Sequence, residues 1–395
     1  MITELDRLVD EISGRLVEIR RLIHQHPEPS GKEEKTSTLV ASILWELGIP
    51  HVERVGGYGV VGTIKGERPG PTIALRADMD ALPLHDAKET SYASQVPGVA
   101  HACGHDAHTA MLLGVAMVLS RLKEQLPGNV KLIFQPSEES ISGAAKMIEE
   151  GVLDDLPVSA IVALHCYPYL PAGEAGIKAG PVMAASDSFN FTISGKGGHA
   201  SRPHETIDAV LIAAQAVSAI HQIVSRRINP LSPAVITLGT IEGGTARNVI
   251  ADKVRVAGTM RSLTPQVRDT LMQALEQTLD GICRVHGASY ELTFTERTPA
   301  VVNDGDIMAT VSEALADVLG DGAVHTLGDP AMGSEDFAYY LEKIPGCLFR
   351  LGTGGEERFS YPLHHRCFDI NEKALPIGVK ALALSAIRLL ERRTA

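Results

Sequence analysis

The pattern of apolar and polar positions predicts two helices at the start of the chain. Residues 1–27 carry charges throughout, yet their apolar side chains recur every three or four positions, as on one face of an amphipathic helix. These apolar positions are Leu5, Leu8, Val9, Ile12, Leu16, Ile19 and Ile23. After a proline-rich turn, a second periodic stretch predicts a helix over 33–47.

Three short apolar runs then end in polar side chains that are able to do chemistry. The run PTIAL leads to Asp78 and Asp80, NVKLIF to Glu138 and Glu139, and AIVAL to His165. Each run is too short for a core helix, and helical patterns lie between the runs, so we expect buried strands of an α/β sheet. Ligands of such sheets bind beyond the carboxyl ends of the strands. The sequence therefore predicts that these side chains gather at one functional edge.

From about residue 184 the pattern changes to period-two alternation, interrupted by two long helical stretches. The order strand, helix, strand, strand, helix, strand is typical of a compact two-layer α/β insert of ferredoxin-like type. We therefore expect an α/β protein whose first domain is discontinuous, 1–183 and 297–395, with a mainly parallel sheet flanked by helices. The insert covers 184–296. In the returning chain we expect helices near 306–319 and 334–342, the strand CLFRLG and a last helix.

Length, charge and cysteine content narrow the possibilities. At 395 residues the chain exceeds what one hydrophobic core usually holds, which favours two domains. Its net charge of -12 argues against a nucleic-acid partner or an anionic membrane surface. The five cysteines are scattered without a CxxC pair, which is typical of a reducing compartment. We therefore expect a cytoplasmic protein.

The stretch HACGHDAH, residues 101–108, holds three histidines, a cysteine and an aspartate within eight residues. Taken singly, Cys103 is better explained as a small buried hydrophobe and each histidine as a satisfied polar group. Taken together they favour a metal site, because thiolate, imidazole and carboxylate groups bind Zn²⁺ and its divalent neighbours. Asp106 and Thr109 are available as caps for the helix that follows, and a helix N-terminus favours the thiolate form of cysteine.

A series of motifs carries a resemblance to a known family. The motifs are, in order, RADMDALPL, HACGHDAHTAMLLG, FQPSEES, GKGGHASRPH, GGTARNVIAD, GTMRS, GSEDF and YPLHH. In this order they resemble the amidohydrolases of the aminoacylase and carboxypeptidase metallopeptidase family. The most similar branch holds hippurate hydrolases, N-acyl-L-amino acid amidohydrolases and indole-acetyl-amino acid hydrolases. The match runs from RRLIHQHPEPS to the last helix, so it covers nearly the whole chain.

The resemblance implies a site for two divalent metal ions in the first domain. The implied ligands are Cys103, His105, Glu139, His165 and His364. Glu138 matches the family's general base, and Asp80 matches the aspartate that orients a ligand. His365 is a second candidate ligand, because Arg366 stands where the family commonly has proline. The choice among Zn²⁺, Mn²⁺, Co²⁺ and Ni²⁺ stays open, since a mixed Cys, His and Glu set accepts them all.

The resemblance also implies that the insert is a lid and dimerisation domain, in a homodimer or homotetramer. His199 matches a histidine that reaches the active site of the other subunit. Asn248 and Arg261 match residues that hold the carbonyl and the carboxylate of the substrate, and Gly333 and Ser334 of GSEDF are expected to bind substrate as well. For Arg261, an ordinary strand-surface arginine remains an equal alternative.

The activity implied by the resemblance is cleavage of the amide bond of a small N-acyl-L-amino acid. In this reaction Glu138 takes a proton from a water activated by the metal ions and returns it to the leaving amine. One alternative is a metallo-carboxypeptidase or dipeptidase that acts on unmodified peptides. Another is a metal-dependent binding protein without catalysis. Acetyl, benzoyl and related acyl groups stay open, because no motif fixes the shape of the cleft.

Overall fold

The computed structural model describes residues 2–394, and the chain divides into two compact units. The first unit holds the chain up to Gly180, Val302–Gly328 and everything from Glu335 onward. The second unit holds Pro181–Val301 and the short piece Asp329–Ser334. It therefore extends slightly beyond 184–296 at both ends and takes in a few residues of the returning chain.

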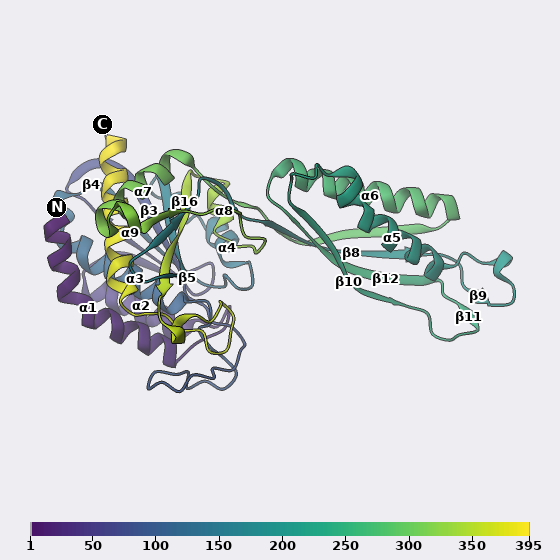
Figure 1. Cartoon of the computed structure of the whole chain (residues 1–395), viewed down its shortest axis with the longest axis horizontal. Helices are drawn as coiled ribbons and strands as arrows, with labels where there is room; N and C mark the ends of the chain where they lie inside the picture. Colours follow the sequence, from purple (N-terminus) through teal and green to yellow (C-terminus); the bar gives the residue numbers. More distant parts are fainter. Residues whose placement is uncertain (1, 395) are drawn as a thin grey trace. The chain divides into compact units, whose positions relative to one another are not determined.

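A mixed, mainly parallel sheet forms the centre of the first unit, as the sequence predicted (Figure 1). Its strands are β1 (His51–Val55), β2 (Gly59–Lys65), β3 (Arg68–Asp78), β4 (Pro127–Gln135), β5 (Val158–Pro171), β6 (Ala175–Ile177), β15 (Val324–Thr326) and β16 (Gly346–Gly354). They lie in the order β1-β2-β4-β3-β5-β16-β6-β15. The neighbours β4, β3, β5 and β16 run parallel, so their carboxyl ends share one edge.

Helices cover this sheet and bury the apolar face that the sequence predicted for the first helix. They are α1 (Ile2–Gln25), α2 (Glu34–Glu46), α3 (His105–Arg121), α4 (Gly143–Glu149), α7 (Gly305–Leu319), α8 (Ala338–Leu341) and α9 (Ala374–Thr394). α1, α3 and α9 pack on one another, and α3 and α9 also pack on β3. The helix expected over 334–342 is wrong in length. Its first residues instead form a turn that directs Glu335 and Asp336 toward Arg76.

The second unit is an antiparallel sheet with two helices on one face. Its elements are β8 (Ala185–Ser194), β9 (Gly198–His199), α5 (Ala209–Arg227), β10 (Ala234–Gly243), β11 (Val249–Ile250), β12 (Lys253–Ser262), α6 (Pro265–His286) and β13 (Ser289–Thr298). The sheet has the order β10-β12-β8-β13. β7 (Gly180–Met183) and β14 (Val301–Asn303) lie where the chain changes unit. Phe189, Phe191 and Leu275 are buried in a core between the sheet and α5 and α6.

Within residues 2–394, α5 alone has the length and composition of a membrane span, which is weak evidence for one. Asp208 caps this helix through the amides of Val210 and Leu211. The buried side of α5 packs on α6 and on the sheet. These contacts are those of a core helix that covers one face of a sheet.

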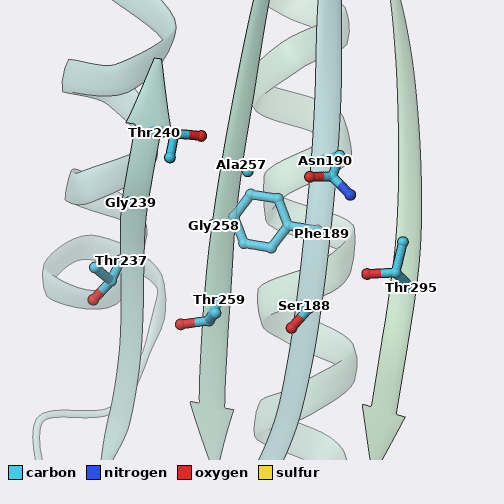
Figure 2. A pocket seen from close by; sticks show the side chains of 10 residues that line it. All are labelled: Ser188, Phe189, Asn190, Thr237, Gly239, Thr240, Ala257, Gly258, Thr259 and Thr295. Carbon is cyan, nitrogen blue, oxygen red and sulfur yellow. The ribbon is translucent and has the colours of Figure 1, made fainter. Parts of the chain in front are cut away.

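A shallow pocket opens on the same sheet, and Figure 2 shows hydroxyl groups and glycines along it with helices behind the strands. Ser188, Thr237 and Thr259 contribute hydroxyl groups, whereas Gly239 lacks a side chain. The strand pairing shifts register at Gly239 in β10 and at Thr295 in β13, so a bulge lies on each edge strand at this level. None of the lining residues is acidic, basic or a cysteine, so this pocket offers no group for acid-base chemistry or metal binding.

Candidate metal centre

The candidate ligands of the first unit converge at the carboxyl edge of its parallel strands. Cys103 lies in the loop before α3, His105 begins that helix, Glu139 follows β4, His165 lies within β5 and His364 precedes α9. Donor atoms of Cys103, His105 and His165 lie within 4.8 Å of one another, and so do those of Cys103, Glu139 and His364. The Cys103 sulfur therefore belongs to both groups. This is the arrangement that a ligand shared by two neighbouring ions would have.

Backbone carbonyls fix the orientation of two of the histidines. The Nδ1 atom of His105 lies 2.9 Å from the carbonyl oxygen of Asp80, and Nδ1 of His165 lies 2.9 Å from the carbonyl oxygen of Cys166. A carbonyl only accepts hydrogen bonds, so each Nδ1 carries a proton and Nε2 is the ring nitrogen left to bind a metal ion. His165 Nε2 lies 3.5 Å from the Cys103 sulfur. Both rings are thus oriented as metal-binding histidines usually are.

Two buried polar atoms in this cluster are left without hydrogen-bond partners. Among the described residues, the two atoms of the ligand cluster are His105 Nε2 and Glu139 Oε1, which lie 3.9 Å apart. His364 Nε2 lies 3.4 Å from the same Glu139 oxygen. A buried polar atom without a partner costs free energy, whereas an ion between these donors would satisfy both. The mixture of thiol, imidazole and carboxylate donors therefore fits a borderline divalent metal.

The two adjacent histidines of the YPLHH motif have different surroundings. The His364 amide donates to the carbonyl of Ala102 at 2.7 Å, which ties this segment to the loop that carries Cys103. His364 also has a φ of 65°, a left-handed conformation that is uncommon for a residue with a side chain. His365 instead accepts a hydrogen bond from a backbone amide at 3.1 Å and stacks on Tyr361. The geometry therefore favours His364 as the ligand.

Glu138 and Asp80 lie directly beside the candidate ligands. The amides of Glu138 and Glu139 donate to the two carboxylate oxygens of Asp80, at 3.1 and 3.0 Å. Asp80 Oδ1 is also 3.3 Å from His105 Nδ1. Burial raises the pKa of Glu138 well above its usual range, and the negative charges of Glu335 and Asp336 raise it further. A carboxylate with a raised pKa, next to a metal site, is suited to accept a proton from water.

Glu335 and Asp336 are site residues that the sequence reasoning missed. The two acids follow Gly333 and Ser334 in the GSEDF motif, and their carboxylates lie within 4.8 Å of Glu138 as a buried group. Arg76 donates to Glu335 Oε1 and to Asp336 Oδ1, at 3.0 Å each. The guanidinium balances part of the negative charge that surrounds the candidate base. The GSEDF motif, in which the two acids follow Gly333 and Ser334, is the signal in the sequence that points to them.

A second buried network of hydrogen bonds connects the loops that carry the candidate ligands. It shows that the two residues expected to cap α3 have other partners. Asp106 does not cap α3, because its Oδ2 accepts from Arg20 Nε at 2.7 Å and lies 2.6 Å from His24 Nδ1. Thr109 does not cap it either, since its hydroxyl donates to a carbonyl of β3. Arg20 also donates to Asp369 at 2.8 Å. The guanidinium therefore joins the segment after His105 to the segment after His364.

The remaining sequence-predicted site residues belong to the second unit. His199 and Asn248 are exposed and adjacent, because β9 pairs with β11 and the amide of Ala200 donates to the carbonyl of Asn248. His199 Nδ1 accepts from the amide of Ser201 at 3.1 Å, which leaves Nε2 as an N–H donor. The carbonyl of Gly333 accepts from the amide of Ala184, and Ser334 is half-buried beside it.

Arg261 lies at the opposite end of this sheet from His199. Lys253, at the start of β12, pairs with Ser194 near the segment of His199, whereas Arg261 pairs with Ser186 at the far end. At about 3.3 Å per residue, the eight steps along β12 from Lys253 to Arg261 span about 26 Å. A small substrate does not reach across such a distance. His199 and Arg261 of one chain therefore do not serve the same substrate molecule from these positions.

Comparisons with known proteins agree on one family and on similar relatives. Residues 74–388 match peptidase family M20/M25/M40. The chain is 41% identical to an N-acetylcysteine deacetylase of Bacillus subtilis, over 95% of this chain and 97% of that protein. It is 42% identical to thermostable carboxypeptidase 2 of Saccharolobus solfataricus, over 98% of each. Among solved structures, the YXEP protein of Bacillus subtilis, described as a dinuclear metal binding peptidase, is 36% identical with a TM-score of 0.85. That match covers 97% of this chain and 99% of YXEP.

These matches span nearly all of the chain, including every segment that contributes to the buried cluster of the first unit. The relatives are called deacetylase, carboxypeptidase and metal-binding peptidase, names that all describe hydrolysis of an amide bond. The resemblance drawn from the motifs is thereby confirmed. The chain belongs to peptidase family M20/M25/M40.

Proposed function

We propose that this chain is a metal-dependent amidohydrolase that cleaves N-acyl-L-amino acids to a carboxylate and a free amino acid. The observation that carries the proposal is the cluster in which the Cys103 sulfur belongs to two groups of potential ligands, one buried and one that reaches the surface at His364, with the buried Glu138 alongside. One group is completed by His105 and His165, and the other by Glu139 and His364. Two divalent ions are expected, and the description of the YXEP protein as dinuclear supports this number.

The chain's own residues account for the proton transfers of the reaction. Metal ions bound here would polarise the amide carbonyl and lower the pKa of a water molecule. Glu138 takes the proton from that water and later gives it to the leaving amine. Asp80 holds the amides of Glu138 and Glu139, so one carboxylate faces the ligand cluster while the other stays free for the proton. The buried acids Glu335 and Asp336 favour a Glu138 that can hold a proton between the two steps.

The acyl substrate is favoured over an unmodified peptide by the relative that removes an acetyl group from N-acetylcysteine. A carboxypeptidase or dipeptidase activity is the second candidate, and the carboxypeptidase relative of similar identity supports it. The two activities share the same chemistry at the amide carbonyl. They differ in what binds on its acyl side, which is an uncharged acyl group in one case and an amino acid with a free amine in the other.

We further propose that the second unit is a lid and dimerisation domain whose groups serve two different sites. His199 and Asn248 would reach the active site of a second subunit, because they lie at the Lys253 end of β12, which spans about 26 Å from Lys253 to Arg261. His199 Nε2 would donate to the developing oxyanion, while Arg261, Gly333 and Ser334 would bind the substrate. A symmetric homodimer, or a homotetramer built from it, meets this requirement.

A reducing cytoplasm is the proposed location. The five cysteines are free, and four of them are buried. Cys103 in particular has to stay reduced to act as a metal ligand.

The experiment is a substrate panel after chelation and re-addition of each metal in turn. N-acetyl-, N-benzoyl- and longer N-acyl-L-amino acids are assayed beside dipeptides with free amines. The proposal predicts turnover of the acyl substrates only with added Zn²⁺, Mn²⁺, Co²⁺ or Ni²⁺. Turnover of dipeptides alone would favour the carboxypeptidase or dipeptidase activity. Turnover without added metal would contradict both proposed activities.

A further inference from the structure

The loop between α1 and α2 lies against the loop that carries Glu138 and Glu139. Its residue Glu33 is fully buried, and its Oε1 accepts from the amide of Ser137 at 2.8 Å. The same oxygen accepts from the amide of Gly31 at 2.9 Å, within its own loop. A carboxylate from residue 33 thus holds the backbone one residue before the proposed general base.

Ser137 has an unusual backbone conformation. Its φ is 60°, in the left-handed region, which a residue with a side chain adopts only under strain. Its carbonyl accepts from the amides of Ser142 and Gly143, at 3.2 Å each. Hydrogen bonds on both sides of the residue therefore maintain the bend. The bend sets the direction in which the next two residues, Glu138 and Glu139, leave the end of β4.

Helix capping does not explain the burial of Glu33. Glu33 is the N-cap residue of α2, but its side chain makes no capping hydrogen bond. The amides at the helix start donate instead to Glu28, from Lys35 at 3.0 Å and from Thr36 at 2.9 Å. Glu28 therefore stabilises the helix, and the Glu33 carboxylate is directed at the bend of Ser137.

We propose that Glu33 is a positioning residue, which holds the left-handed bend at Ser137 and thereby directs Glu138 and Glu139 into the site. The inference rests on the proposed function in so far as it assigns these two carboxylates to the reaction. Within residues 2–394 the Glu33 carboxylate accepts from Gly31 and Ser137 and from no candidate metal ligand, so we expect it to act through the backbone. Its second oxygen, Oε2, is buried and has no hydrogen-bond partner within residues 2–394. One acceptor atom is therefore enough, and a neutral amide with the same shape should serve.

The test compares Glu33→Ala with Glu33→Gln and, as a matched control, Glu28→Ala. Glu33→Ala should lower kcat about 10-fold to 100-fold at saturating metal, with KM changed less than about threefold, because small misplacements of catalytic groups have such effects. Glu33→Gln, which keeps the acceptor oxygen, should stay within about threefold of the wild type in kcat. Glu28→Ala should lower the unfolding temperature but leave kcat unchanged, since it removes only the cap.

Hydrogen exchange followed by mass spectrometry, on peptides that cover residues 134–142, supplies a readout without substrate. Exchange in this segment should be faster in Glu33→Ala than in the wild type, in Glu33→Gln or in Glu28→Ala. The variant Glu33→Ala/Ser137→Gly should recover part of the lost kcat, because glycine adopts a positive φ without cost.

Unchanged kcat in Glu33→Ala, or an equal loss in Glu28→Ala, would overturn the inference. No recovery on adding Ser137→Gly would also contradict it, because the loss would then not come from the bend. These outcomes are distinct from failure of the proposed function, which would appear as an active Glu138→Ala enzyme and would leave the exchange result intact.

Discussion

The two units present their candidate functional groups in opposite ways. In the first unit, Asp80, His105 and Glu138 are buried and held by backbone amides and carbonyls. In the second unit, His199 and Asn248 are exposed at the end of a sheet, and Arg261 lies at the other end. The candidate groups of the first unit are therefore preorganised, whereas under the proposed function those of the second unit would act on another molecule that binds against them.

This difference follows from the two sheets. Parallel strands bring their carboxyl ends to one edge, so the residues after β3 and β4 gather there with His165 of β5. In the antiparallel sheet, neighbouring strands end on opposite sides, so His199 and Arg261 are separated by the length of β12. The candidate metal ligands thus gather at the first sheet, and under the proposed function the second sheet would link one site to another.

The largest expected effect separates a base from a ligand within the first unit. Glu138→Ala should lower kcat about 10³-fold to 10⁴-fold and keep its metal, since a positioned general base contributes up to about 10⁴. Glu139→Ala should lose metal as well as activity. Elemental analysis and steady-state kinetics on both variants test this split, with Glu149→Ala, an exposed residue of α4, as the control. Equal metal loss in the two site variants would contradict the separate roles.

A smaller effect is expected from the second unit. His199→Ala should lower kcat about 10²-fold to 10³-fold, the usual loss on removal of one oxyanion donor, while metal content and unfolding temperature stay unchanged. His204→Ala is the matched control, because that histidine is exposed on the same segment. A rise in KM alone, without loss of kcat, would mean that His199 binds the ground state and not the transition state.

The smallest effect concerns metal affinity. Cys103→Ser should weaken metal binding by about 10-fold to 100-fold, because the thiolate is replaced by a weaker and harder ligand, and added metal should restore part of the activity. Competition with a chelator measures the affinity. Cys367→Ser, outside the cluster, should bind metal as the wild type does. Unchanged affinity in Cys103→Ser would remove this sulfur from the site.

The sequence predicted the fold correctly, and indicated the candidate site, where an apolar run leads directly to polar side chains. The runs before Asp78, Glu138 and His165 form β3, β4 and β5, and the mainly parallel sheet is confirmed. The caps expected for α3 were wrong, because Asp106 bonds to Arg20 from α1. No local pattern could reveal that contact, since 86 residues separate the partners.

The same limit applies to Glu33. In the sequence it is one of several acids near the start of a helix, where acids are common for reasons of capping and helix dipole. Only the packed structure brings its carboxylate to the amide of Ser137. The left-handed φ of Ser137 and of His364 also gave no signal, because glycine, the usual residue at such positions, is absent from both.

The contrast between the two units is tested most directly by mixing two inactive enzymes. Glu138→Ala lacks the proposed base of the first unit, and His199→Ala lacks the donor that the second unit would supply to a partner. After confirmed subunit exchange in an equal mixture, about half of the dimers are mixed and each holds one complete site, so about a quarter of the wild-type activity should return. Return of activity would support both the catalytic first unit and the shared second unit. A mixture that exchanges subunits and stays inactive would contradict the account, because His199 would then act within its own chain or not at all.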